Sequence, residues 1–116
     1  MKEQKNDGRV VVTIIDLLAK DIHENAVNKG FWEGDRNDGE CIALMHSELS
    51  EALEAMRHGN PPDKHCPEFD NATVELADCI IRILDFAAAR NMNIGEALFA
   101  KMNFNATREY KHGKRF

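Results

Sequence analysis

Two pairs of acidic residues, each with members three positions apart, have the clearest capacity for chemistry in this chain. The pairs are Glu48 with Glu51 and Glu75 with Asp78. Residues three apart lie on one face of a helix, so each pair points two carboxylates the same way. The first pair has mainly apolar neighbours on its face, where unpaired carboxylates are costly to bury. Because Mg²⁺ prefers oxygen ligands, we expect these four residues to bind it, with Mn²⁺ able to replace it.

The second pair also has a simpler interpretation, as part of a solvated surface. One polar stripe contains Glu75 and Asp78 together with Arg82 and Asp85. Asp78 and Arg82 are four residues apart, the spacing of an ordinary ion pair within a helix. A charged stripe usually faces water. The prediction of a metal site therefore depends on the two pairs together.

A basic face near the end of the chain would complement an anionic substrate. Lys101, Asn105 and Arg108 share one helix face, and Lys111 and Lys114 follow shortly afterwards. Cations at a helix C-terminus also stabilise the helix dipole, so each has a structural interpretation as well. Lysine and arginine would balance the charge that a metal leaves on a polyphosphate. We expect these five residues to bind phosphate groups.

Two adjacent aromatic residues, Phe31 and Trp32, lie in a polar segment that is rich in glycine and aspartate. Aromatic rings stack on any nucleobase, so both residues are candidates for binding a base. The alternative is that they anchor a loop at one end of the protein. His46 falls on the opposite side of its helix from the glutamates, and His23 suggests no function.

Helical periodicity accounts for nearly all of the chain, so we expect an all-α fold. Residues 1–9 are expected to be a disordered tail, and residues 10–116 a single domain with a basic C-terminal tail. Four helices are expected, over residues 10–28, 40–57, 71–90 and 94–110.

The third expected helix is apolar around most of its circumference, which is typical of an element at the centre of a bundle or at an interface. We therefore expect a four-helix bundle-like domain in which antiparallel helices two and three are central. Four short helices cannot cover so apolar an element, so we also expect a homodimer or a dimer of dimers.

The composition excludes several classes of partner. The formal net charge of −5 argues against binding a nucleic-acid polymer or an anionic membrane. No apolar run approaches the ~20 residues that span a bilayer, and the polar start has no signal-peptide core. Three cysteines without a C-x-x-C motif do not indicate a disulfide framework. We expect a cytoplasmic protein with reduced thiols.

Other metal sites are less consistent with the sequence. The segment that contains His58, His65 and Cys66 lacks a second pair of ligands, which disfavours a zinc site. The helices that carry the acidic pairs have no Glu-x-x-His motif, which disfavours a di-iron bundle.

The two acidic pairs, with twenty-three residues between them, resemble the motifs of the MazG-like all-α nucleoside triphosphate pyrophosphohydrolases. The basic residues from Lys101 to Lys114 resemble the phosphate-contacting end of small members of that superfamily. The resemblance implies Mg²⁺-dependent hydrolysis of a nucleoside triphosphate, deoxynucleoside triphosphates (dNTPs) included, to a monophosphate and pyrophosphate by a homo-oligomer. It also implies that the four acidic residues are catalytic metal ligands.

One position departs from the superfamily pattern, because Ser47 stands where a second glutamate often precedes the first motif. Fewer metal ions, or help from Glu54 or Asp85, would compensate. Phosphoribosyl-ATP pyrophosphohydrolase, from the same superfamily, is an alternative activity. A non-catalytic helical dimerisation module, in which the carboxylates form only ion pairs, is the alternative from another class.

Overall fold

The computed structural model describes residues 2–116, with side chains described from residue 8 onward, and it is all-α as expected. Four α-helices are followed by one short 3₁₀ helix. They are α1 (Lys2–Asn28), α2 (Asp38–Arg57), α3 (Asn71–Ala89), α4 (Ile94–Ala106) and η1 (Tyr110–Gly113).

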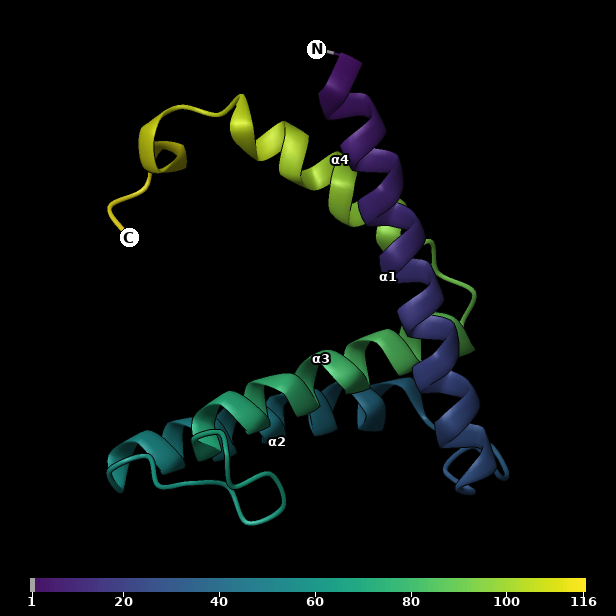
Figure 1. Ribbon diagram of the computed structural model, residues 1–116, viewed down its shortest axis with the longest axis vertical. Helices are drawn as coiled ribbons and strands as arrows, with labels where there is room; N and C mark the ends of the chain where they lie inside the picture. The colour runs from purple at the N-terminus through teal and green to yellow at the C-terminus, as the bar shows by residue number, and fades with distance from the viewer. Residues whose placement is uncertain (1) are drawn as a thin grey trace.

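Helices α2 and α3 form an antiparallel hairpin, and this pair has the most extensive contact between helices (Figure 1). The expected pairing of these two helices is therefore confirmed. Helix α1 crosses the end of α3. Helix α4 crosses α1 and packs against it rather than against the hairpin (Figure 1). The four helices thus form an open arrangement, in which α4 diverges from α2 and α3.

Two helix ends differ from the sequence-based expectation. Helix α1 begins at Lys2, so residues 2–9, expected to be a disordered tail, are helical. Residues 2–5 are lysine, glutamate and glutamine, which are strong helix formers. Helix α4 ends at Ala106, four residues early, where the hydroxyl of Thr107 donates a hydrogen bond to the Phe104 carbonyl.

Side chains and one glycine fix the helix ends that flank the hairpin. The side chain of Asn37 accepts a hydrogen bond from the Glu40 amide and caps α2, and that of Asp70 accepts one from the Thr73 amide and caps α3. Helix α1 ends at Asn28, and Gly30 follows with a φ of 87°, in the left-handed region. The Phe31 amide then donates to the Ala26 carbonyl, as in a Schellman motif. This cap sets the direction in which the chain leaves α1.

Small residues let α2 and α3 approach each other closely. Ala52, Ala55 and Ala72 form a buried cluster between the two helices. Large apolar side chains, in contrast, remain exposed on all four helices, for example Leu17, Leu53, Ile80 and Met102.

The isolated chain is also less compact than a monomer of its size. Its accessible surface is 9104 Å², whereas a folded monomer of 13.1 kDa exposes about 6,400 Å². Its radius of gyration is 16.8 Å, against about 13 Å for a compact domain of this length. The isolated chain therefore leaves a large apolar surface exposed.

The crossing of α1 and α4 depends on Gly95. A Cβ atom at this position would lie 2.5 Å from the Asp16 carboxylate and 2.9 Å from the Val12 carbonyl oxygen. We predict that Gly95→Val lowers the free energy of unfolding by about 1–3 kcal/mol, because the helices must separate. Ala97→Val, at an exposed site of the same helix, is the control. Equal effects of the two changes in urea denaturation would contradict a tight crossing.

Candidate metal and nucleotide site

Three of the four predicted metal ligands meet between α2 and α3. Glu48, Glu51 and Glu75 each offer one carboxylate oxygen, and these oxygens all lie within 4.8 Å of one another. Glu48 is buried, with 6% of its surface exposed, Glu75 is half-buried and Glu51 is exposed at the rim. The antiparallel pairing of two i, i+3 motifs thus produces the carboxylate cluster that the spacing predicted.

Two oxygens of this carboxylate cluster have no hydrogen-bond partner. The Oε2 atoms of Glu48 and Glu75 are both buried, and neither accepts a hydrogen bond from the described residues. An unpaired buried carboxylate oxygen costs free energy, because it has lost its water without replacement. A hard divalent cation would satisfy such oxygens, so the residues present fit a site for Mg²⁺.

The cluster also shifts the acidity of its members. The pKa of Glu75 is raised to about 7, first by burial and then by the neighbouring Glu51 and Glu48. Burial would also raise the pKa of Glu48, but hydrogen bonds, chiefly from Arg82, outweigh it and leave that pKa lowered. The cluster therefore pairs a Glu48 whose pKa is lowered with a Glu75 whose pKa is raised to about 7.

The fourth predicted ligand, Asp78, lies outside this group of three. It lines a cavity of about 350 Å³ together with Glu48, on the side of the cluster toward α1. Burial raises the pKa of Asp78, and the charge of Glu48 adds to the effect. Glu51 and Glu75 instead line a second cavity, beside the α2–α3 loop. The cluster thus separates two cavities, and Asp78 belongs to the first.

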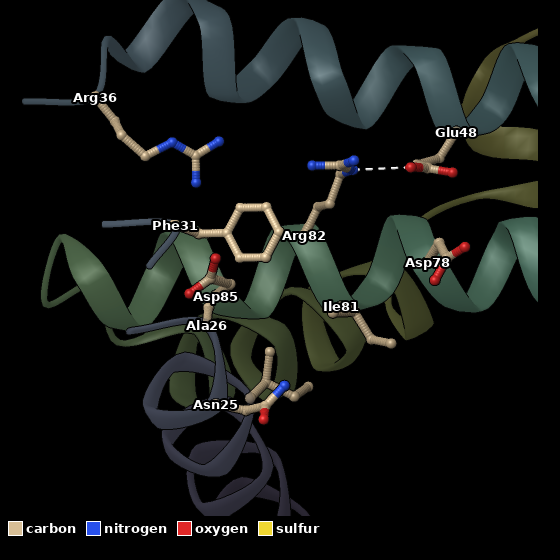
Figure 2. Close-up of a pocket in the computed structure, with 10 residues that line it drawn as sticks. Asn25, Ala26, Phe31, Arg36, Glu48, Asp78, Ile81, Arg82 and Asp85 are labelled. Atoms are coloured by element: carbon tan, nitrogen blue, oxygen red, sulfur yellow. Dashed lines mark hydrogen bonds and ion pairs between the residues drawn. The ribbon is translucent and has the colours of Figure 1, made fainter. Parts of the chain in front are cut away.

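Arg82 pairs across the hairpin rather than within α3. Its Nε donates to Glu48 Oε1 over 2.9 Å (Figure 2), and the side chain lines the first cavity. No Asp78–Arg82 ion pair is found among the described side chains. The interpretation of the polar stripe as a solvated face is therefore wrong, because Arg82 contacts α2 and Asp85 is buried.

The sequence did not identify Asp63, which supports Glu75 through an intermediate side chain. Asp63 is buried and accepts hydrogen bonds from the amides of His65 and Cys66 and from the side chain of Asn71. The same Asn71 nitrogen donates to Glu75 Oε1 over 3.1 Å. An aspartate shortly after two prolines is typical of a turn in which the side chain binds nearby amides, and this signal was available.

A second network missed in the sequence joins α1 and the following loop to α3. Asp85 Oδ1 accepts hydrogen bonds from His23 Nδ1, at 2.8 Å, and from Trp32 Nε1, at 3.0 Å. Arg36 stacks over the Trp32 ring, 4.7 Å from its centroid. His23, which suggested no function, thus helps to hold the buried Asp85 carboxylate. Only tertiary structure brings these residues together.

The two aromatic candidates for base binding differ in their environment. Trp32 is held by Asp85 and by Arg36, as an anchored loop residue would be. Phe31 is 63% exposed and lines the first cavity (Figure 2). Only Phe31 therefore has a ring placed to stack on a ligand in this cavity.

The structure does not bring the predicted phosphate-binding residues to the carboxylate cluster of the same chain. Lys101 and Arg108 instead lie over the ring of Phe104, at 4.7 and 5.5 Å from its centroid. Neither cavity at the cluster is lined by a residue of α4. The Oδ1 atom of Asn105 is buried and has no hydrogen-bond partner among the described residues. Lys111 and Lys114 are exposed near the end of the chain.

Comparisons with known proteins give no assignment. No family model, no curated protein and no solved structure matches this chain. Among the described helices, none combines the length and the apolar character needed to cross a membrane.

The raised pKa of Glu75 predicts a pH-dependent stability in metal-free buffer. Between its ordinary pKa of 4.5 and about 7, the unfolded state releases a proton that the folded state keeps. This residue therefore makes the free energy of unfolding fall as pH rises through that window. We expect Glu75→Gln to remove this contribution, so that the variant gains stability relative to wild type as pH rises.

Urea denaturation with EDTA at several pH values measures the effect. Glu68→Gln, an exposed loop residue, is the control and should follow the wild-type curve. If the free energy of unfolding changes with pH in the same way for wild type and Glu75→Gln, the pKa of Glu75 is not raised in the folded protein.

Proposed function

We propose that this protein hydrolyses a nucleoside triphosphate to the monophosphate and pyrophosphate, with Mg²⁺ as its cofactor and Mn²⁺ as a substitute. The observation that carries the proposal is the pair of buried, unpaired oxygens on Glu48 and Glu75, together with the cavity of about 350 Å³ that Glu48 lines. The resemblance of the two acidic motifs to the MazG-like pyrophosphohydrolases supports the same activity.

In this proposal Glu48, Glu51 and Glu75 hold the cation, and Asp78 joins them from the wall of the first cavity. A bound Mg²⁺ would neutralise phosphoryl oxygens and orient a water molecule for attack. Glu75 must give up its proton to act as a ligand, so we expect metal affinity to fall below about pH 7. Asp63, acting through Asn71, keeps the Glu75 carboxylate in position.

Arg36 and Arg82 are the two described cations that line the same cavity as Glu48 and Asp78, and Arg82 is the one bound to Glu48. Its Nε is bound to Glu48, and its two terminal nitrogens form no hydrogen bond with the described residues. A guanidinium group binds phosphate oxygens through such nitrogens. We propose that Arg82 contacts a phosphate group of the substrate while its Nε remains on Glu48.

Self-association would explain both the exposed apolar surface and the position of α4. The chain exposes about 2,700 Å² more than a compact monomer of its mass, whereas a standard interface covers about 800 Å² on each partner. In a homodimer or a dimer of dimers, α4 of one copy would be free to approach the carboxylate cluster of another. Lys101, Asn105 and Arg108 would then bind phosphate from the second copy.

We predict that the protein is oligomeric at micromolar concentration and that Leu53→Lys reduces its mass in light scattering. Leu53 is 53% exposed and lies on α2 with three other exposed apolar residues, Ile42, Leu49 and Met56. A lysine there would place a charge in the interface, at a cost of a few kcal/mol. Ser47→Lys, at an exposed polar site on a different face of the same helix, is the control. A wild-type monomer of 13.1 kDa would contradict the proposal.

Pyrophosphate release across a panel of nucleoside triphosphates tests the activity. We predict release that requires Mg²⁺ or Mn²⁺ and stops with EDTA, and a loss of about 10²-fold or more in kcat for Glu51→Gln. Glu68→Gln should retain wild-type activity. Because the charge stabilised by the metal develops mainly in the transition state, kcat should change more than KM.

Three outcomes would contradict the assignment in different ways. Hydrolysis of phosphoribosyl-ATP alone would favour the related pyrophosphohydrolase. No release from any substrate would favour a non-catalytic dimerisation module. Full activity in Glu51→Gln would show that other carboxylates hold the metal.

A further inference from the structure

The first cavity contains a buried carboxylate that the hydrolysis of phosphates does not require. Asp85 lines this cavity, and the residue is 9% exposed. It lies seven residues beyond Asp78 on α3, toward α1, on the side where Ile22 and Ala26 form an apolar wall. In Figure 2 its carboxylate points toward the ring of Phe31. The cavity thus joins a stacking surface, an apolar wall and one fixed hydrogen-bond acceptor.

The hydrogen bonds of Asp85 fix its orientation and leave part of its accepting capacity free. A carboxylate only accepts hydrogen bonds, so His23 Nδ1 and Trp32 Nε1 are both donors. Oδ1 accepts from both of them, whereas Oδ2 accepts only from Trp32 Nε1, over 3.1 Å. A carboxylate oxygen has two lone-pair positions, so Oδ2 retains one.

A ligand group that meets this free position must be a hydrogen-bond donor. A carbonyl oxygen there would face the carboxylate, and both groups would lack a donor. Among nucleobases, cytosine and adenine present an exocyclic amino group where uracil and hypoxanthine present a carbonyl. One remaining acceptor position suits one such N–H group.

We propose that this cavity selects nucleotides whose base has an exocyclic amino group at pyrimidine C4 or purine C6, which donates to Asp85 Oδ2 while the base stacks on Phe31. The inference rests on the proposed nucleotide substrate and adds its base class. Phe31 provides affinity for any base, because stacking is tolerant of base identity. Asp85 provides the selection, and His23 and Trp32 hold it in place.

The test compares matched bases in two independent measurements. Pyrophosphate release with Mg²⁺ is measured for CTP against UTP and for ATP against ITP. Binding of CMP and UMP is measured by the fluorescence of Trp32, the single tryptophan, which needs no hydrolysis. We expect the amino-bearing member of each pair to be favoured about tenfold or more in kcat/KM and in affinity, as a hydrogen bond to a charged group provides.

Three variants separate base selection from a structural role. Asp85→Asn should abolish or reverse the preference for cytosine over uracil, because the amide can donate to a carbonyl. Phe31→Ala should weaken CMP and UMP binding by the same factor. Asp21 is an exposed aspartate on α1 that lines none of the described cavities. Asp21→Asn should therefore change neither the preference for cytosine nor the affinity for CMP and UMP.

Equal treatment of cytosine and uracil by the wild-type protein would overturn this inference, and so would a uniform loss for all bases in Asp85→Asn. If Asp85→Asn does not fold, as judged by circular dichroism, the wild-type ratios decide alone. Selective CMP binding without pyrophosphate release would keep the base site and reject the proposed hydrolysis. Hydrolysis without base preference would keep the proposed hydrolysis and reject the base site.

Discussion

The burial of carboxylates between α2 and α3 is the constraint on which the rest of the structure depends. Glu48 is almost fully buried, and burial together with the neighbouring Glu51 and Glu48 raises the pKa of Glu75 to about 7. One arginine, Arg82, offsets part of the charge by binding a single Glu48 oxygen. The remaining unpaired oxygens destabilise the fold unless a cation or a proton satisfies them. A chain selected only for stability would have little reason to keep them.

The surrounding elements hold the carboxylate cluster in place. Alanines at the α2–α3 contact bring the two acidic motifs together, and Asp63 fixes the loop that joins them. On the other side, the cap at Gly30 directs Phe31 and Trp32 toward α3. Large apolar side chains outside this contact remain exposed.

Local patterns in the sequence predicted the features that depend on local geometry. The helical periodicity located four helices, and the i, i+3 spacing placed Glu48, Glu51 and Glu75 on facing surfaces. The pairing of Arg82 with Glu48 could not be predicted, because an i+4 partner on its own helix was equally available. The position of α4 could not be predicted from the sequence either, because it depends on the angle at which α4 crosses α1.

The central claim, that the carboxylate cluster binds a divalent cation, is tested most directly by titrating the metal-free protein with Mn²⁺ and detecting free Mn²⁺ by electron paramagnetic resonance. The account predicts saturable binding by wild type at pH 8, competition by Mg²⁺, and loss of binding in Glu48→Gln, with Glu68→Gln unchanged. Undiminished binding in Glu48→Gln, or no saturable binding by wild type, would contradict it.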